Sequence, residues 1–427
     1  MRHKFLLILL IFSSFFLVAN DSTKIYLATI GPGDDIFLRW GHFAIVVDYP
    51  DKPDVLFDYG NFSFQQDQFI PNFIKGIMTY FKYKKSADFE LAGYMNANRT
   101  ITLQELNLTQ EQVQEYIDKL LDEVKPENRF YQYDHYYNNC VSQMSDFLDE
   151  LSNGEFYKGT SKLTGRSFRD LSRDYVSSNY MINLLIMFVL GSKVDYNINE
   201  KEAMFLPDYT MNRADHVFIQ SNGDFIPLVK EKTVVYQSVN RDPVIVNSKP
   251  KTLLNLFIGI ILAVLSLLIL KIRILKGFQD IIAGLIMGFS GSILFFMSFF
   301  TGHYYIHNNW NLILVNPLTF TLFVGGLIQL RKKHYGLGIK ISRIYVDSTL
   351  LFTIIMLMLK SINLIKQDNL EIIMLFLPIL IVNSSFMTLF SFYSGSSNKL
   401  PSSPSISLDA SSSASLDEMT TVEDSGK

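Results

Sequence analysis

LLNLFIGIILAVLSLLIL, residues 253–270, carries no charge and is long enough to cross the hydrocarbon core of a bilayer as a helix. Further apolar stretches follow it at residues 281–300, 312–330, 346–365 and 370–392. A bilayer offers the backbone no hydrogen-bonding partners, so each stretch is expected to form a helix that satisfies its own polar groups. The sequence therefore predicts a membrane domain of about five transmembrane helices over residues 251–393.

Basic residues beside these stretches predict the orientation of the chain. Lys271, Arg273 and Lys276 follow the first stretch, and a second basic cluster follows the third stretch at residues 331–343. In contrast, the loop GHYYIHNN at residues 302–309 contains no Lys or Arg. Because basic loops remain in the cytoplasm, the domain that precedes the membrane helices is expected to lie outside the cytoplasm.

Both ends of the chain agree with this orientation. Residues 1–20, MRHKFLLILLIFSSFFLVAN, have the basic start and apolar run of a secretory signal peptide. Cleavage near Ala19 is one outcome and an uncleaved anchor is the alternative, and both deliver residues 21–250 to the outside. Residues 394–427 are rich in Ser and acidic side chains, which predicts a disordered cytoplasmic tail.

The composition excludes several classes of function. The formal net charge is −3, whereas nucleic-acid binding needs clustered basic residues, so we expect no nucleic-acid partner. The single cysteine, Cys140, allows no intrachain disulfide and no multi-cysteine zinc or iron–sulfur site. His303 and His307 share a loop, but no Glu or Cys completes a ligand set there. We therefore predict no metal and no cofactor.

The exported domain shows signals for both strands and helices. Apolar, β-branched runs predict strands at residues 25–30, 42–49 and 55–60. Residues 108–124 have the spacing of an amphipathic helix that is capped by Thr109, with Gln112 in the capping-box position. A second helix is predicted from NNCVSQMSDFLDEL, residues 138–151, with Asn138 or Asn139 as its cap. The exported domain is therefore expected to have an α+β fold.

Cys140 falls in the first turn of this second helix, and that position has a chemical consequence. The positive end of the helix dipole favours a thiolate, and free N–H groups there can hold an oxyanion. A nucleophilic thiol also needs a nearby acid or base, and the exported domain offers His42, His135 and His216. A buried, inert cysteine fits the same position, so the residues alone leave both alternatives open.

Several motifs resemble the Lnb N-terminal periplasmic domain family. They are PGDDIFLRWGHFAIVV (32–47), FDYGNFSF (57–64), PNFIKGIMTY (71–80), NRTITLQELNLTQEQ (98–112), ENRFYQYDHYYNNCVSQMSDFLDE (127–150), SFRDL (167–171) and FLPDY (205–209). Residues 301–318, TGHYYIHNNWNLILVNPL, are similar to the membrane half found in some members. The resemblance implies a bacterial inner-membrane protein with a periplasmic N-terminal domain and a cytoplasmic tail.

The family in turn resembles the circularly permuted branch of the papain-like fold, which includes NlpC-like hydrolases. The fold class implied is a permuted papain-like domain followed by an all-α membrane bundle. In that branch the His strand precedes the Cys helix, which implies Cys140 as nucleophile and His42 as general base. Asp58 is implied as the residue that orients the imidazole, a role that an Asn can also serve. Tyr133 and Trp40 are implied to line the substrate site.

Two functions from different classes are compatible with this resemblance. The first is a membrane-anchored thiol hydrolase or acyltransferase that acts outside the cytoplasm on an amide or ester of the cell envelope. The second is a non-catalytic factor that uses the same scaffold to assist the maturation of exported proteins. The expected partners are the lipid bilayer and an envelope peptide, lipid or exported-protein client. A transporter or sensor with an external domain is a further alternative.

Overall fold

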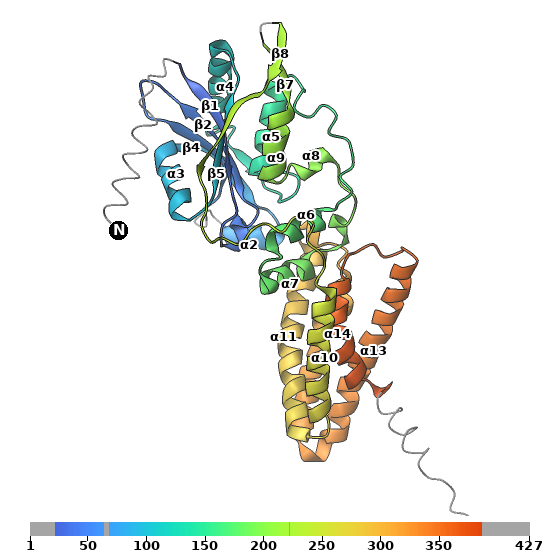
Figure 1. The fold of residues 1–427 in the computed structure, drawn as a ribbon. Helices are drawn as coiled ribbons and strands as arrows, with labels where there is room; N and C mark the ends of the chain where they lie inside the picture. Colours follow the sequence, from blue (N-terminus) through green and yellow to red (C-terminus); the bar gives the residue numbers. More distant parts are fainter. Residues whose placement is uncertain (1–21, 64–67, 222, 387–427) are drawn as a thin grey trace, which may run out of the picture. The chain divides into compact units, whose positions relative to one another are not determined.

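A computed structural model describes residues 22–63, 68–221 and 223–386 (Figure 1). The predicted signal peptide, residues 1–20, and the predicted tail, residues 394–427, lie outside these ranges. The signal and tail predictions therefore remain predictions.

An antiparallel sheet forms the centre of the exported half. Its strands follow the order β6-β4-β3-β2-β1-β5-β9. The bounds are β1 Lys24–Ile30, β2 His42–Asp48, β3 Val55–Asn61, β4 Thr79–Ser86, β5 Ile101–Leu106, β6 Phe130–Gln132 and β9 Val229–Tyr236. A separate hairpin pairs β7, Phe218–Ser221, with β8, Asp224–Pro227. The three strands predicted from the sequence correspond to β1, β2 and β3.

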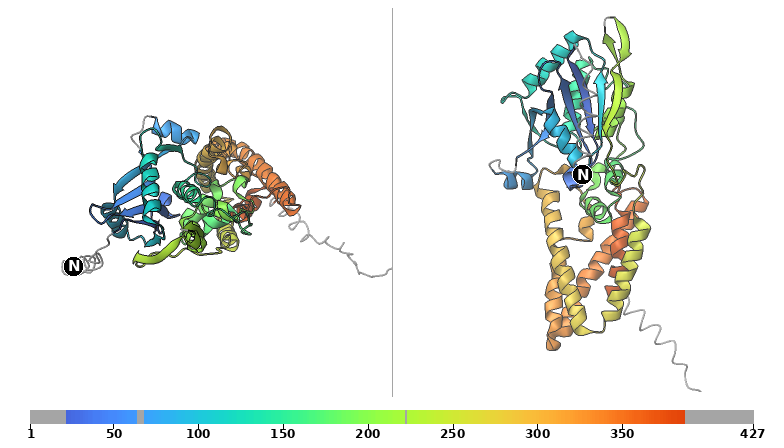
Figure 2. Two further views of the ribbon diagram at one scale, coloured as in Figure 1. Left: turned by 90° about the horizontal axis from the view of Figure 1, so that it is seen from above. Right: turned by 60° about the vertical axis from the view of Figure 1, so that its left-hand side comes forward.

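The side-chain alternation of the central strands gives the sheet two buried faces. On one face Leu27, Phe43 and Ile45 belong to the core that also contains α4, Gln110–Glu123, and α5, Cys140–Leu151. On the other face, small and branched side chains pack against α3, Ala87–Asn96; they include Ala28, Ala44, Val46 and Leu56. Because strand side chains alternate between faces, each strand supplies both cores. Figure 2 shows the strands from two further sides.

The two predicted helix starts are formed by side-chain caps. Thr109 accepts the Gln112 backbone N–H, and the Gln112 side chain accepts the Thr109 N–H, which completes a capping box. Asn139, rather than Asn138, caps α5. The apolar stripe of α5 is buried as its spacing predicts, with Val141, Met144 and Phe147 among its residues.

Four further helices follow α5 along the chain. They are α6 Phe168–Val176, α7 Tyr180–Val189, α8 Glu200–Ala203 and α9 Pro207–His216. Helix α2, Phe69–Lys75, precedes β4. On α6, the guanidinium of Arg169 is buried, pairs with Asp195 at 2.6 Å and also donates to the carbonyls of Leu190 and Gly191. Arg173 on the same helix is buried and pairs with Glu371 at the start of the last membrane helix.

The membrane half contains α10 Thr252–Ile269, α11 Arg273–Phe300, α12 Phe320–Leu330, α13 Tyr335–Ser361 and α14 Leu370–Asn383. Within the described residues, four spans are long and apolar enough to cross a membrane: Thr252–Ile269, Arg273–Phe300, Trp310–Leu330 and Lys332–Ser361. The fifth predicted span corresponds to α14, which has 14 residues and is shorter than a full crossing. The last residues predicted for it, 387–392, lie outside the described ranges.

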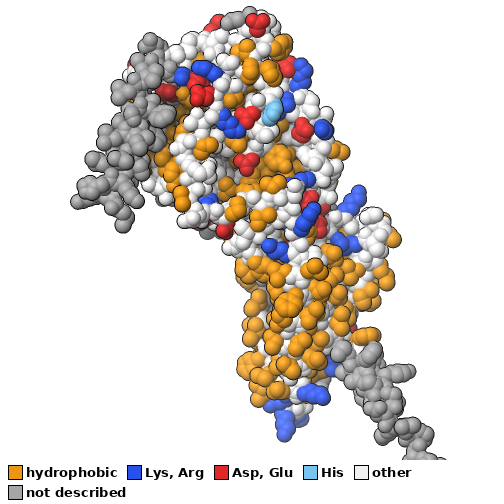
Figure 3. Space-filling model, viewed as in Figure 1, with side chains coloured by type: hydrophobic (Ala, Val, Ile, Leu, Met, Phe, Trp, Pro, Cys, Tyr) orange, Lys and Arg blue, Asp and Glu red, His pale blue; other side chains and the backbone are white. Residues whose placement is uncertain are grey.

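The surface of the membrane half has the polarity that a bilayer requires. Apolar side chains cover the side of the helices seen in Figure 3, and Lys and Arg gather at one end. At that end Lys271, Lys332 and Lys333 are exposed in the turns that join consecutive helices. At the other end, the turn from Thr301 to Ile306 contacts the exported half, where the Gly302 N–H donates to the Lys75 carbonyl at 2.6 Å.

Candidate active site

Cys140 is the first residue of α5, and its backbone is held by the cap of that helix. The Asn139 side-chain oxygen accepts the N–H groups of Val141 and Ser142, each at 2.9 Å. The Asn139 amide donates in turn to the carbonyls of His135 and Phe205 at 2.9 Å. Because Asn139 is buried and fully engaged, it holds the first turn of α5, in which Cys140 has intermediate exposure.

His42 is the first residue of β2 and faces this sulfur. The distance from its Nδ1 to the Cys140 Sγ is 3.3 Å, although the two residues are 98 positions apart. Sulfur contacts are longer than those between nitrogen and oxygen, so this separation is within hydrogen-bonding range. The structure therefore brings the predicted nucleophile and the predicted base into contact.

Asp58, on the adjacent strand β3, engages the opposite nitrogen of the ring. Its Oδ1 lies 3.0 Å from His42 Nε2 and also accepts the Gly60 N–H at 2.7 Å. Its Oδ2 accepts a hydrogen bond from the Lys85 ammonium at 3.0 Å. The pairing of β2 with β3 places Asp58 opposite Ala44, two residues after His42 on the neighbouring strand. This register brings the carboxylate close to the imidazole.

These contacts polarise the imidazole. Burial alone would lower the pKa of His42, but the Asp58 carboxylate and the Cys140 sulfur outweigh burial and raise the pKa to about 10. Burial also opposes the charging of Asp58, yet His42, Lys85 and the Gly60 N–H together hold the pKa of its carboxyl below the ordinary value. At neutral pH the arrangement is a protonated imidazole between a carboxylate and a sulfur.

Gly60 is the residue that allows this close approach. A Cβ at position 60 would lie 2.8 Å from the Cε1 atom of His42 and 3.4 Å from the Asp58 carboxylate. Any side chain there would displace the ring from its contacts, because the strand backbone itself cannot yield. Gly60 thus both donates to Asp58 and leaves the space that His42 occupies.

The predicted substrate residues lie beside this group. Tyr133 stacks on Tyr80 with ring centroids 4.0 Å apart, and its hydroxyl is 3.4 Å from His135 Nδ1. Burial, with Tyr80 and Cys140 nearby, holds the pKa of Tyr133 well above its usual value, so the phenol is neutral. Trp40 and His135 form a T-shaped pair with ring centroids 4.5 Å apart. No residue within the described ranges accepts its buried indole N–H.

The other two candidate histidines are separate from the sulfur contact. Burial lowers the pKa of His135 to about 4, so its ring is neutral among Trp40, Tyr136 and Phe205. His216 is exposed and contacts the Asn212 carbonyl. Among the three histidines of the exported domain, His42 is the one that the described structure places against Cys140.

Sequence reasoning missed several polar groups of the site. Lys85, Tyr94 and Arg99 come from β4, α3 and the turn before β5; Arg99 lies in the motif at residues 98–112, but nothing in that motif pointed to a role at the site. The Tyr94 ring is 6.2 Å from the His42 ring, and the Arg99 guanidinium lies 5.2 Å from the centroid of Tyr94. The one available signal was the glycine two residues after Asp58.

The described residues contain no cluster of three metal-ligating side chains. His303 contacts the Tyr305 hydroxyl at 3.0 Å, and His307 contacts the Thr301 carbonyl at 2.8 Å. Both rings are thus engaged by the turn in which they lie.

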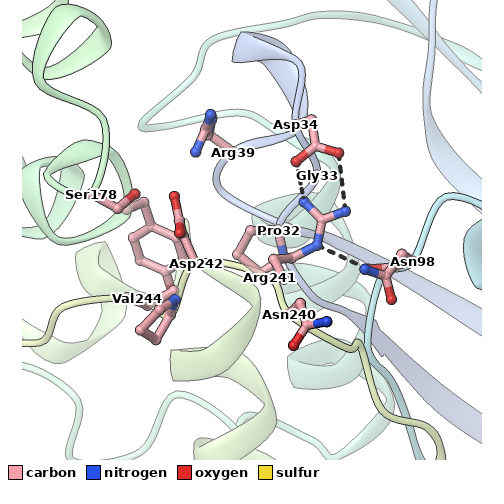
Figure 4. Close-up of a pocket in the computed structure, with 12 residues that line it drawn as sticks. Pro32, Gly33, Asp34, Arg39, Asn98, Ser178, Asn240, Arg241, Asp242 and Val244 are labelled. Carbon is pink, nitrogen blue, oxygen red and sulfur yellow. Dashed lines mark hydrogen bonds and ion pairs between the residues drawn. The ribbon is translucent and has the colours of Figure 1, made fainter.

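A polar cleft of about 270 Å³ lies next to the loop between β1 and β2 (Figure 4). Arg39, Asp242 and Ser178 line it, together with Arg241, which pairs with Asp34 at 2.7 Å. Cys140, His42 and Asp58 are not among its lining residues. The cleft is therefore distinct from the contact between the sulfur and the imidazole.

An exported α/β half with a Cys–His–Asp arrangement, joined to a helical membrane half, defines the chain as a membrane-anchored envelope protein. Residues 13–171 match the Lnb N-terminal periplasmic domain, and residues 244–394 match the Lnb transmembrane domain. The chain therefore belongs to the Lnb family, with a periplasmic N-terminal domain and a transmembrane domain. Comparison with curated proteins and with solved structures gave no match.

Proposed function

We propose that this protein is a membrane-anchored thiol hydrolase or acyltransferase that acts on an amide or ester of the cell envelope. Residues 21–250 would form the catalytic domain and residues 251–393 its membrane anchor. The observation that carries the proposal is the 3.3 Å contact between Cys140 Sγ and His42 Nδ1, with His42 Nε2 held by Asp58 at 3.0 Å. A nucleophile, a base and an orienting carboxylate in this sequence of contacts are the elements of acyl transfer.

In the first step, the Cys140 thiolate attacks the substrate carbonyl carbon, and the protonated His42 gives its proton to the departing amine or alcohol. The product is a thioester on Cys140. In the second step, water or an acceptor nucleophile attacks the thioester while His42 takes its proton. The bond to sulfur breaks and the thiolate returns. Asp58 stabilises the imidazolium in both steps because it keeps its charge throughout.

The first turn of α5 would supply an oxyanion donor. Asn139 already occupies the N–H groups of Val141 and Ser142. We assign the Cys140 backbone N–H as the donor to the developing oxyanion, because it belongs to the attacking residue itself. The buried indole N–H of Trp40 is a second candidate for a substrate oxygen, since an unpaired buried donor needs an acceptor.

The order of elements supports a permuted papain-like fold for the exported domain. The strand that carries His42 precedes the helix that begins at Cys140, as in that branch. Strand β2 and helix α5 also pack against each other in one core. This fold assignment supports the catalytic proposal, which depends on the contacts of Cys140, His42 and Asp58 and does not require the assignment.

The location of the site favours an envelope substrate. The Tyr136 ring lies 5.9 Å from the ring of Tyr305, which follows the outer end of α11. The Gly191 N–H donates to the Tyr305 carbonyl at 2.8 Å, so this turn of the membrane half is anchored on the exported half. A substrate that reaches Cys140 is thus processed beside the outer end of the membrane helices.

The decisive experiment is alkylation of Cys140 by iodoacetamide in the full-length protein in a neutral detergent. Cys140 is the sole cysteine, so incorporated label reports on this sulfur alone. At pH 6 we expect the wild type to react at least ~100-fold faster than His42→Ala, because an imidazolium beside sulfur maintains the thiolate well below the ordinary thiol pKa of about 8.5. His216→Ala is the matched control and should react like the wild type.

Equal rates for the wild type and His42→Ala, with both proteins folded by circular dichroism, would contradict the enzymatic proposal. That result would instead favour the non-catalytic maturation factor, in which the same scaffold holds an exported client.

A further inference from the structure

Arg99 is buried without a carboxylate partner among the described residues. The side chain is 3% exposed. Its Nε donates to the Gly31 carbonyl at 2.8 Å, while its Nη2 has no hydrogen-bonding partner among the described residues. No carboxylate within those residues forms an ion pair with it. An unpaired guanidinium in a protein interior is costly, so its retention calls for a counter-charge.

Contacts connect Arg99 to the reacting atoms. The guanidinium lies 5.2 Å from the Tyr94 ring centroid, and the Tyr94 ring is 6.2 Å from the ring of His42. His42 in turn contacts the Cys140 sulfur. Burial lowers the pKa of Arg99, and the Cys140 sulfur and Asp58 carboxylate are near enough to oppose that shift. The positive charge is thus part of the electrostatic environment of the site.

Two charged side chains near Arg99, Arg241 and Asp58, already have partners. Arg241 pairs with Asp34 and donates to the Asn98 carbonyl. Asp58 is engaged by His42, Lys85 and the Gly60 N–H. Among the described residues Arg99 therefore forms no ion pair, although the Cys140 sulfur and the Asp58 carboxylate act on its charge.

We propose that Arg99 recognises an anionic oxygen group carried by the substrate next to the bond that Cys140 attacks. The guanidinium suits this role because its planar set of donors matches the oxygens of a carboxylate or phosphate. The inference rests on the proposed function, and it narrows the substrate class to amides or esters with a negative charge close to the carbonyl.

The test uses two alkylating agents that differ in charge. Iodoacetate and iodoacetamide attack the same sulfur, so the ratio of their rates measures the preference of the site for an anion and cancels the reactivity of the thiol. The full-length protein is labelled in a neutral detergent and chloride buffer. We expect the iodoacetate-to-iodoacetamide ratio to fall about tenfold in Arg99→Gln, because a nearby charge in a partly desolvated site alters the approach of an anion by that order.

Two variants control for other effects. Arg99→Lys keeps the positive charge and should retain most of the ratio, which also guards against a folding defect in Arg99→Gln. Lys232→Gln removes a surface cation that pairs with Asp215 and should leave the ratio unchanged.

The outcomes separate the inference from the proposal on which it depends. If both rates fall equally in Arg99→Gln, Arg99 supports the thiolate rather than an anionic substrate, and the inference is wrong. If phosphate at equal ionic strength lowers the ratio in the wild type but not in Arg99→Gln, phosphate competes with iodoacetate at Arg99, which supports the inference. The dependence of iodoacetamide labelling on His42 tests the catalytic pair separately, whatever the ratio does.

Discussion

Two polar clusters, one at Cys140 and one on α6, contain buried charged side chains whose hydrogen-bonding groups are satisfied to different extents. Arg169 on α6 satisfies its guanidinium with Asp195 and with the carbonyls of Met187, Leu190 and Gly191. At the site, His42 lies between a carboxylate and a sulfur, and Arg99 retains an unpaired nitrogen. In the α6 cluster every guanidinium nitrogen of Arg169 has a partner, so this cluster stabilises the fold. In the cluster at Cys140 a buried donor has no partner, and a bound substrate can accept a hydrogen bond from it.

The largest effect is expected where the satisfied cluster is broken. Arg169→Met leaves the Asp195 carboxylate buried without its cation, which should lower the free energy of unfolding by about 4 kcal/mol. Thermal denaturation monitored by circular dichroism measures the change. Arg213→Met is the matched control, because Arg213 donates to backbone carbonyls and should cost about 1 kcal/mol. If the two losses were equal, the contrast drawn between the clusters would fail.

A smaller effect on stability and a large one on reactivity are expected at Asp58. Asp58→Asn removes the charge that raises the pKa of His42, so at pH 7 the proton of the pair shifts from the imidazole toward the sulfur. The rate of Cys140 alkylation at that pH should fall by roughly 100-fold, since an adjacent carboxylate shifts a pKa by about 2 units. Asp195→Asn provides the comparison and should leave the alkylation rate unchanged. A similar loss in both variants would show that the rate reports on folding instead of on the site.

The smallest expected effect is the pH dependence that His42 gives to the free energy of unfolding. In a Cys140→Ala background, the Asp58 carboxylate still stabilises the protonated form of His42 in the folded protein. The folded pKa of His42 is therefore higher than its pKa in the unfolded chain. Its stabilisation is fully present below about pH 6.5 and is lost as the pH rises through the folded pKa, at up to about 1.4 kcal/mol per pH unit. Urea titrations of this variant and of Cys140→Ala/His42→Ala should diverge accordingly. Parallel curves would mean that Asp58 does not hold the proton.

The sequence predicted those features that depend on neighbouring residues. The capping box of Thr109 and Gln112, the cap at Asn139 and the strand at His42 are each encoded within a few positions. The membrane helices follow from composition, although α13 begins at Tyr335, before the predicted residue 346, because its first turns are amphipathic. The catalytic roles of Cys140, His42 and Asp58 came from the family resemblance and remain a proposal.

The features that were missed depend on distant parts of the chain. Lys85 reaches Asp58 because β4 pairs with β3 in a register that places Lys85 opposite Leu56. The sequence FRDLSRDYV of α6 has the charge of a surface helix, yet Arg169 and Arg173 are buried because Asp195 and Glu371 come from elsewhere. No local pattern specifies either pairing, since the partners are brought together by the packing of separate elements.

The presence of one thiol in the whole chain has a consequence for survival outside the cytoplasm. A partly exposed sulfur next to an imidazolium is the form that peroxide converts to sulfenic acid. With no second cysteine, the chain has no resolving thiol with which to trap that state as an internal disulfide. Recovery from oxidative damage must therefore depend on an external reductant, which makes the redox condition of the envelope a determinant of how long each molecule stays intact.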